Sequence, residues 1–292
     1  MEFCQVDSGF DEEGLFEVLL GEATKRVRDF AEFRECVGQD LHLDFYPQGD
    51  FHPSKNLSPK TLEHIQNLIG ENVEGYLALN PKQIAWECAK GKLESVLKKF
   101  TQNHLDLSGG LREKTMQEVL KEGVLACDSV VVVHLPHITK NLNSNSAPKS
   151  AIAPNPAFAS KSAITSKPTQ YIILDSSLNH TCTNLLLRKA KTPTQARIML
   201  ELQSGNPISI ITAFAYQSHK GFFCNIDCAE FLLGEFCQDD IECYVKSSLW
   251  QGSAGCVKVE GFHKGYIISQ KGLDSCALGL GFERILPFLG II

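Results

Sequence analysis

The sequence predicts two mixed lobes: an α/β N-terminal lobe with a partly parallel sheet at residues 1–140, and an α+β C-terminal lobe with a mostly antiparallel sheet at residues 169–292. Helix and strand patterns alternate through the first 140 residues, whereas strand patterns dominate after residue 205. A segment at 141–168, rich in Ser, Ala, Asn and Pro, separates the two patterns. The 292 residues suffice for two domains of ordinary size.

In the first lobe, apolar residues at helical spacing predict a helix from about Glu12 to Phe33. Ser58-Pro59 marks the start of a second helix that ends near Gly70, and Asn80-Pro81 starts a third that runs to about residue 100, because proline suits the first helical position. A further helix is expected at 111–126. Strands are expected at 41–45, 75–79 and 129–135, and the last, which is apolar on both faces, is predicted to be central.

The segment from Asn141 to Pro168 is expected to be a flexible linker. No Asp or Glu occurs between Asp128 and Asp175, and four prolines fall between residues 148 and 168. Such a composition buries too little apolar surface to offset the entropy of ordering. We therefore place the domain boundaries on either side of it.

The second lobe is predicted to open with a strand at 171–174 and a short helix at 183–189. Thr192-Pro193 starts a helix that ends near Gly205. Turn patterns at 217–221 and 261–265 indicate hairpins. Strands are expected at 208–215, 221–226, 241–247, 255–260 and 265–269, with helices at 227–236 and at the C-terminal end of the sequence.

Composition narrows the class of protein. The apolar runs are short of the roughly 20 residues that a membrane span needs, and the acidic N-terminal stretch lacks the pattern of an export signal. The net charge is −6, and no basic stripe is present, which disfavours autonomous nucleic-acid binding. We expect a cytoplasmic protein that does not bind membranes.

The eleven cysteines are interpreted mainly as reduced core thiols, because they sit in apolar segments. Thiolates also bind zinc, and one cluster offers the alternative of a metal site, although its C-x3-C-x8-C-x5-C spacing lacks the paired knuckles of zinc proteins. The cluster comprises Cys224, Cys228, Cys237 and Cys243, with His219 and His263 nearby in sequence. We predict no bound metal there.

Two further groups of residues could act in catalysis. Cys182 and His180 lie two residues apart, so on an extended chain they face the same side and could form a nucleophile and base. Asp44, Asp50 and His52 follow a predicted strand, where acid–base residues gather in α/β folds, although turn and capping roles also suit them. The common phosphate-loop, dinucleotide, zincin and esterase motifs are absent. The catalytic residues are therefore left unknown.

The run Gly279-Leu280-Gly281-Phe282-Glu283-Arg284 is the most specific motif in the sequence. It resembles motif 3 of class II aminoacyl-tRNA synthetases and their paralogues. The resemblance implies that Gly279 and Gly281 let a nucleotide lie against the backbone and that Arg284 contacts ATP. The alternative is a strand that leads into a buried helix, with Arg284 in an ordinary ion pair. The arginine that the second synthetase motif requires has no counterpart on a C-terminal strand.

This resemblance implies an adenine-nucleotide-binding protein, either a small ligase or a regulatory paralogue, with ATP and Mg²⁺ as its ligands. The alternative, from another class, is a non-catalytic interaction or assembly protein whose two lobes hold protein partners through a flexible tether. Whether the protein is an enzyme is left open.

Overall fold

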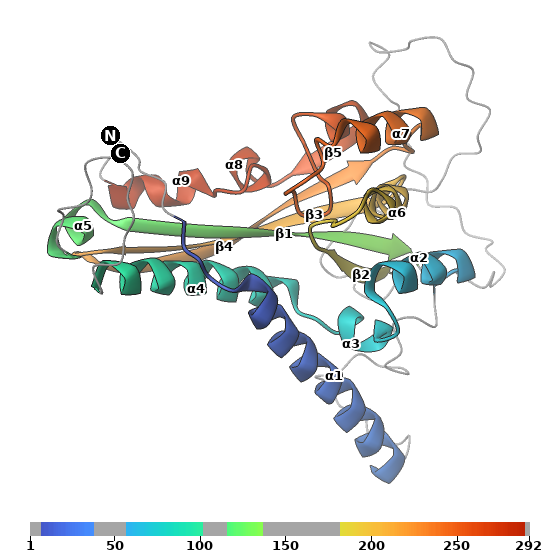
Figure 1. The fold of residues 1–292 in the computed structure, drawn as a ribbon, viewed down its shortest axis with the longest axis horizontal. Helices are drawn as coiled ribbons and strands as arrows, with labels where there is room; N and C mark the ends of the chain where they lie inside the picture. Colours follow the sequence, from blue (N-terminus) through green and yellow to red (C-terminus); the bar gives the residue numbers. More distant parts are fainter. Residues whose placement is uncertain (1–6, 38–56, 102–115, 137–181, 290–292) are drawn as a thin grey trace, which may run out of the picture.

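Five strands form one antiparallel sheet in the order β2-β1-β3-β4-β5 (Figure 1). The computed structural model describes residues 7–37, 57–101, 116–136 and 182–289. The strands are β1 (Val124–Pro136), β2 (Cys182–Leu187), β3 (Pro207–Ser218), β4 (Gly221–Leu233) and β5 (Ile267–Lys271).

The sheet joins residues from both predicted lobes. Val131 of β1 pairs with Leu187 of β2 on one side and with Ile210 of β3 on the other, and both pairings are antiparallel. This differs from the parallel pairing expected in the first lobe, because the described part of residues 1–140 contains only β1 and its neighbours come from the C-terminal half. The segment expected to be a linker, 141–168, lies outside the described residues.

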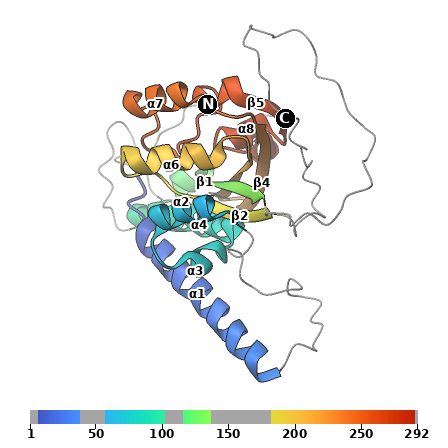
Figure 2. The same ribbon diagram turned by 90° about the vertical axis from the view of Figure 1, so that its right-hand side faces the viewer.

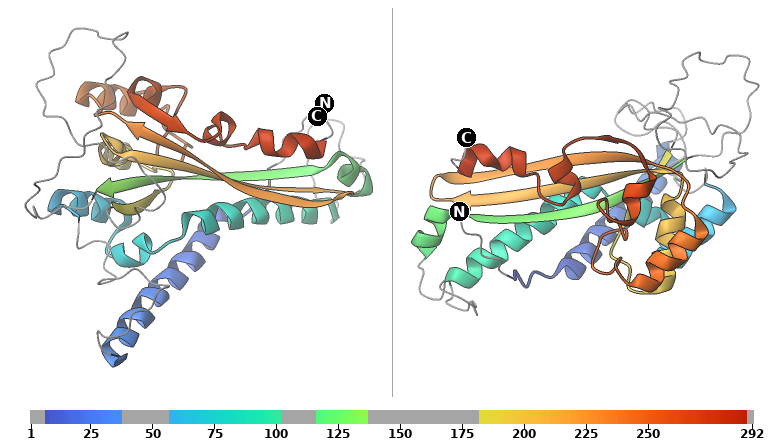
Figure 3. Two further views of the ribbon diagram at one scale, coloured as in Figure 1. Left: turned by 180° about the vertical axis from the view of Figure 1, so that it is seen from behind. Right: turned by 90° about the horizontal axis from the view of Figure 1, so that it is seen from above.

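Helices cover both faces of the sheet. On one face α4 (Pro81–Thr101) packs along β1 and β3, and on the other α8 (Asp274–Ala277) packs on β3 and β4, followed by α9 (Phe282–Ile285) and a short 3-10 turn (Leu286–Leu289) (Figures 1 and 3). At one end of the sheet α6 (Pro193–Gln203) lies between α2 (Pro59–Ile69) and α7 (Gln238–Ser247) (Figure 2). The helix α1 (Glu12–Val37) begins against this body and projects away from it.

The apolar run of β1 forms the centre of the core, as its two-sided apolar pattern predicts. Val130 to Val133 are all buried, and α4 packs on them with the buried Ala85 and Ala89. Small residues at these positions let the helix approach the sheet closely. One continuous cluster of buried side chains includes residues from α1, α4, α6 and the sheet, so the described residues share one main core.

The predicted helix starts at prolines are confirmed. Ser58 Oγ accepts a hydrogen bond from the Thr61 N–H at 3.0 Å, and Thr192 Oγ1 accepts one from the Gln195 N–H at 3.2 Å. Each hydroxyl satisfies an N–H that the first helical turn leaves without an intrahelical partner. At the other end of α2, Gly70 has φ of +79°, a backbone conformation that glycine adopts without steric cost. The hairpin turn after Ser218 is also confirmed.

Several short apolar segments form a different element from the one expected. Residues 75–79, expected to be a strand, begin within the helix α3 (Val73–Leu77), and the helix expected at 183–189 is replaced by β2. The strand β4 continues through most of the helix expected at 227–236, and residues 241–247 are helical in α7 instead of extended. Between α5 (Met116–Glu122) and β1, Gly123 ends the helix expected to reach Ala126. Residues 255–260 belong to no strand, and the strands expected at 41–45 and 171–174 lie outside the described residues.

These errors share one physical cause. A run of four to seven apolar residues fits a buried strand and a buried helix equally well. In α7 the deciding signals are at the ends: Asp239 and Asp240 occupy the first turn and Lys246 the last, where they complement the helix dipole.

Candidate active site

Three charged side chains meet where α1, α4 and β1 come together. Lys92 Nζ of α4 lies 2.8 Å from Glu12 Oε1 and 2.5 Å from Asp128 Oδ1. Glu12 is in the first turn of α1, and Asp128 is on β1. The ammonium group therefore bridges two carboxylates that are distant from it in the sequence.

The fold brings this ion pair out of full contact with water. Lys92 follows Cys88 by four residues, so it lies on the face of α4 that packs on the sheet, and its side chain is 20% exposed. Asp128 is 16% exposed and directly precedes the buried part of β1. A partly buried charge is costly unless an opposite charge lies beside it, and Lys92 and Asp128 supply that opposite charge to each other.

Burial and charge change the proton affinities of the three groups in different directions. Burial raises the pKa of Asp128 above its ordinary value, against the opposing pull of Lys92. Burial works in the same sense on Glu12, but hydrogen bonds and charge from Lys92 and Lys189 outweigh it and lower the Glu12 pKa. Burial would lower the pKa of Lys92, yet the two carboxylates raise it, so the ammonium keeps its charge at neutral pH.

Three more cations line the outer side of this group. Lys189 Nζ is 3.4 Å from Glu12 Oε2, Arg188 Nη2 is 2.6 Å from Glu13 Oε2, and Lys191 Nζ is 3.6 Å from Glu13 Oε1. The Arg188 guanidinium also lies 3.8 Å from the ring centre of Phe16. Arg188 is thereby fixed in place, whereas the Lys191 side chain is 72% exposed and can turn toward a ligand.

All of these residues except Lys92 line a cavity of about 270 Å³, which we name the charged cavity. Glu12, Asp128 and Lys189 line it, together with Cys88. Burial, followed by the nearby carboxylates, raises the pKa of the Cys88 thiol to about 12, so this thiol is protonated and is a poor nucleophile at neutral pH.

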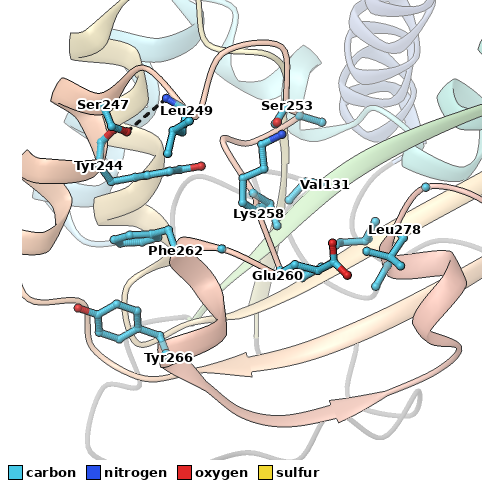
Figure 4. Close-up of a pocket in the computed structure, with 18 of the residues that line it drawn as sticks. Val131, Tyr244, Ser247, Leu249, Ser253, Lys258, Glu260, Phe262, Tyr266 and Leu278 are labelled. Atoms are coloured by element: carbon cyan, nitrogen blue, oxygen red, sulfur yellow. Dashed lines mark hydrogen bonds between the residues drawn. The ribbon is translucent and has the colours of Figure 1, made fainter.

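A second and larger cavity, of about 1250 Å³, lies beside the charged cavity (Figure 4). Ser129 and Ala254 line both, so the two cavities share a wall. The larger one mixes aromatic, apolar and polar side chains, which suits a ligand with a flat ring and polar edges. Its labelled lining residues include Tyr244, Ser253, Lys258, Glu260, Phe262 and Leu278.

A chain of hydroxyl groups fixes the shared wall. Ser129 Oγ is 2.7 Å from Thr212 Oγ1, which donates to the Cys276 carbonyl oxygen at 2.8 Å. Gly279 approaches the same place: a Cβ added there would lie 3.4 Å from Ser129 Oγ, and its φ is +91°. The backbone therefore comes close to Ser129 at a position where only glycine adopts the observed conformation without strain.

Of the three residues in the synthetase-like motif, the structure brings only Gly279 to the large cavity. The motif contains no strand: residues 279–281 connect α8 to α9, and residues 282–284 belong to α9. Gly281 faces Asp227 and Phe214, and Arg284 Nε lies 3.5 Å from Asp227 Oδ1 with 56% of its side chain exposed. Neither lines the two cavities described above, and the nucleotide-binding role of all three residues stays a prediction.

The other candidates do not form a site in the described part of the chain. Cys224 and Cys228 lie on β4, whereas Cys237 caps α7 and Cys243 lies within it, and no group of three or more potential metal ligands gathers among the described residues. Three of these four thiols are exposed, which differs from the expected core positions. Burial raises the pKa of Cys182, which opposes a nucleophilic role. His180, Asp44, Asp50 and His52 lie outside the described residues.

Sequence reasoning missed the charged cavity entirely. The available signals were a lysine on the apolar face of a helix, at Lys92, and a carboxylate inside an apolar strand, at Asp128. The pairing of Glu12 with Lys92 and Lys189 carried no local signal, because these residues are far apart in the sequence. Only packing of α1 and α4 on the sheet brings them together.

The arrangement can bind a polyanion and a divalent cation. Lys189 and Lys191 offer positive charge at the outer side of the charged cavity, which suits phosphate groups. The Glu12 and Asp128 carboxylates both point at one atom, Lys92 Nζ, so the Lys92 ammonium occupies the place where they converge. Oxygen ligands of this kind suit Mg²⁺ or Mn²⁺.

Within the described ranges, every helix lacks the length or the apolar character that a membrane span requires.

Comparison with known proteins identifies the family. Residues 136–290 match the model of the family described as Maf-like protein, which is more than half of the chain. A nucleoside triphosphate pyrophosphatase from a Nitratiruptor species is 40% identical over 100 residues, which cover 34% of this chain and 54% of that protein.

Two further relatives carry the same description. The protein from Helicobacter pylori (strain J99 / ATCC 700824) is 41% identical over 106 residues, or 36% of this chain and 56% of the relative. The one from Campylobacter jejuni subsp. jejuni serotype O:23/36 (strain 81-176) is 34% identical over 104 residues, or 36% of this chain and 57% of the relative. Each alignment thus spans only a little over half of the relative's length.

These matches overturn the resemblance to class II aminoacyl-tRNA synthetases. The synthetase-like, ATP-binding ligase or regulatory paralogue that the resemblance implied is wrong, whereas the alternative of a non-catalytic assembly protein stays a prediction. The short motif misled because glycines followed by an arginine occur wherever backbone packs closely before a helix. The chain belongs to the Maf-like protein family.

Proposed function

We propose that this chain is a nucleoside triphosphate pyrophosphatase, which uses water to cleave the bond between the α- and β-phosphates and releases pyrophosphate and a nucleoside monophosphate. One observation carries the proposal: Lys92 bridges Glu12 and Asp128 beside a cavity lined by further cations, and a larger cavity adjoins it. The relatives named nucleoside triphosphate pyrophosphatase support the same activity.

The two cavities divide the substrate between them. The triphosphate lies in the charged cavity, where the lining residues Arg188, Lys189 and Lys191 neutralise its charge. The nucleoside lies in the large cavity, and the α-phosphate lies near the wall formed by Ser129 and Ala254. The bond that breaks is therefore next to the boundary between the cavities.

Asp128 is assigned as the base that takes the proton from the attacking water. Its raised pKa makes it a stronger base than an ordinary aspartate, and the positive charge of Lys92 beside it keeps it ionised at neutral pH. Glu12, with its lowered pKa, is ionised too and holds Lys92 and Lys189 in place. Lys92 holds both carboxylates in place, and Arg188, Lys189 and Lys191, which line the cavity, stabilise the charge that develops on the phosphate oxygens.

Mg²⁺ fits this set of residues. Proteins hold Mg²⁺ through one or two carboxylates and the substrate phosphates, which corresponds to Glu12 and Asp128 with a triphosphate. When bound, the ion would neutralise phosphate charge and polarise the scissile bond. The assay below determines which nucleobase the substrate carries and whether ATP is a substrate.

The test uses the purified chain with each common nucleoside triphosphate and Mg²⁺ or Mn²⁺, and it measures pyrophosphate. In ¹⁸O-labelled water, the label should appear in the monophosphate, because water attacks the α-phosphorus. Asp128→Asn should lower kcat by a factor of about 10²–10⁴, the usual contribution of a general base. Lys92→Met should lower kcat/KM by about 10- to 150-fold, since a charge-assisted hydrogen bond is worth about 1.5–3 kcal/mol.

The matched control is Lys90→Met. Lys90 lies two residues from Lys92 on the same helix but faces solvent, where it is 3.9 Å from Glu87 and 4.0 Å from Glu94. Its replacement should leave kcat/KM within about twofold, because exposed pairs contribute little. Release of orthophosphate in place of pyrophosphate, or equal losses in Lys90→Met and Lys92→Met, would contradict the proposal.

A further inference from the structure

A fully buried polar pair lies behind the wall of the large cavity. Gln203, the last residue of α6, and His263, in the 3-10 turn Phe262–Tyr266, have no exposed surface, and His263 Nε2 is 3.0 Å from Gln203 Oε1. Neither side chain lines the large or the charged cavity. Buried polar groups in this position are costly unless all of their hydrogen bonds are formed.

The backbone decides how the pair is protonated. The Lys258 N–H donates to His263 Nδ1 at 3.1 Å, so Nδ1 carries no proton and the ring proton is on Nε2. Nε2–H therefore donates to Gln203 Oε1, and the Gln203 amide nitrogen donates to the carbonyl oxygens of Met199 at 3.0 Å and Gly255 at 2.7 Å. Burial lowers the His263 pKa to about 4, which agrees with a neutral ring at neutral pH.

Two of the three backbone groups that bond to the pair, those of Gly255 and Lys258, belong to one segment of the cavity wall. Gly255 and Lys258 lie in the segment 253–263, which presents Ser253, Lys258 and Glu260 to the large cavity (Figure 4). The segment is in no strand, and its one sheet-like contact is an isolated bridge between Ala254 and Lys189. Short backbone hydrogen bonds form its turns, and Gln203 and His263 add buried side-chain bonds that tie Gly255 and Lys258 to α6.

The same segment is tied to the charged cavity. The Gly255 N–H donates to the Arg188 carbonyl oxygen at 2.9 Å, and Arg188 is adjacent to Lys189 in the chain. Tyr244 adds a further bond from its hydroxyl to the Cys256 carbonyl oxygen at 3.0 Å. A shift of the segment would therefore change the distance between the two cavities as well as the wall itself.

We propose that Gln203 and His263 are positioning residues that fix the segment 253–263 as the wall against which the nucleoside part of the substrate binds. The inference rests on the proposed function. The two residues would raise the affinity for substrate without contacting it, by holding the wall segment in place. Loss of the hydrogen bond from Gln203 to the Gly255 carbonyl oxygen, or of the one from the Lys258 N–H to His263, should weaken binding of the nucleoside while the phosphate contacts in the charged cavity persist.

The experiment compares His263→Leu and Gln203→Leu with the parent chain. Three quantities are measured: kcat and KM for pyrophosphate release, the inhibition constant of inorganic tripolyphosphate, and direct binding of the α,β-methylene analogues of ATP and UTP. We expect KM and the analogue dissociation constants to rise about tenfold or more, since each variant removes at least one buried hydrogen bond. Neither kcat nor the tripolyphosphate inhibition constant should change by more than about threefold.

Two further variants make the result specific. His263→Asn keeps a polar acceptor near the position of Nδ1, so it should recover part of the affinity, and it carries the test if the leucine variant does not fold. His64→Leu is the matched control. His64 lies on α2, its Nε2 is 3.5 Å from Glu201 Oε2 of α6, and it lines neither cavity. Its affinity should equal that of the parent.

The outcomes separate this inference from the function on which it rests. If the parent hydrolyses nucleoside triphosphates but the His263 and Gln203 variants bind the analogues as tightly as the parent does, the inference fails and the function stands. Equal weakening of tripolyphosphate and nucleotide binding would also overturn it, because the wall would then have no particular role for the nucleoside. If the parent neither hydrolyses nor binds nucleotides, both proposals fail.

Discussion

Acid should destabilise the folded chain through His263. The ring is buried and neutral, and its pKa falls from 6.5 to about 4 on folding. Above pH 6.5 both folded and unfolded chains carry a neutral ring, so this group makes stability independent of pH. Below pH 6.5 the His263 ring binds a proton in the unfolded chain but not in the folded chain. The free energy of unfolding therefore falls until about pH 4 and then levels off.

The size of the effect follows from the pKa difference. Each unit of pKa is worth about 1.4 kcal/mol, so the decrease between pH 7 and pH 4 is about 3 kcal/mol. That is a large part of the stability of an ordinary domain. His263 is fully buried, so solvent screening does not reduce the figure greatly.

The assay is urea denaturation at half-unit steps from pH 7 to pH 4, with the parent chain and His263→Asn in parallel. Other carboxyl groups titrate in both proteins and cancel in the difference. The parent should lose about 3 kcal/mol more than the variant over this range. Parallel curves for the two proteins would refute the argument that His263 is neutral in the fold.

Three further predictions concern other parts of the chain. A double-mutant cycle with Lys92→Met and Asp128→Asn should give a coupling energy of about 1–3 kcal/mol in urea denaturation, because Lys92→Met removes the ammonium beside the half-buried Asp128 and Asp128→Asn leaves Lys92 with Glu12 alone; a coupling near zero would mean that the two groups do not interact. Gly255→Ala should lower the melting temperature and cost about 1–2 kcal/mol, since φ is +58° and the added Cβ would lie 3.0 Å from Val131 Cγ1; an unchanged melting temperature would contradict the strained position. Arg284→Ala should change stability by less than about 1 kcal/mol, because Arg284 is 56% exposed and Asp227 keeps its hydrogen bond from Asn225, whereas a loss of nucleotide affinity in the same variant would favour the binding role predicted from the sequence.

Capping signals in the sequence are sufficient to place several elements. Ser58-Pro59, Asn80-Pro81 and Thr192-Pro193 set the starts of α2, α4 and α6. These signals work because a hydroxyl or amide side chain followed by proline satisfies the first turn of a helix locally. The buried run of β1 is equally clear, since four consecutive valines are compatible with a strand that is covered on both faces.

What the chain could not reveal alone is which distant segments meet. A strand from the first 140 residues takes two neighbours from beyond residue 181, and the antiparallel direction of both follows from pairing across a long separation that no local pattern encodes. The charged cavity has the same origin: Lys92 and Asp128 stand out as charges in apolar segments, but nothing near them in the sequence indicates that Glu12 and Lys189 join them. Helix ends and the buried strand can be read from the sequence, because they depend on neighbours along the chain. The sheet order and the site emerge on folding, because both depend on which apolar faces pack together and on which charges that packing removes from water.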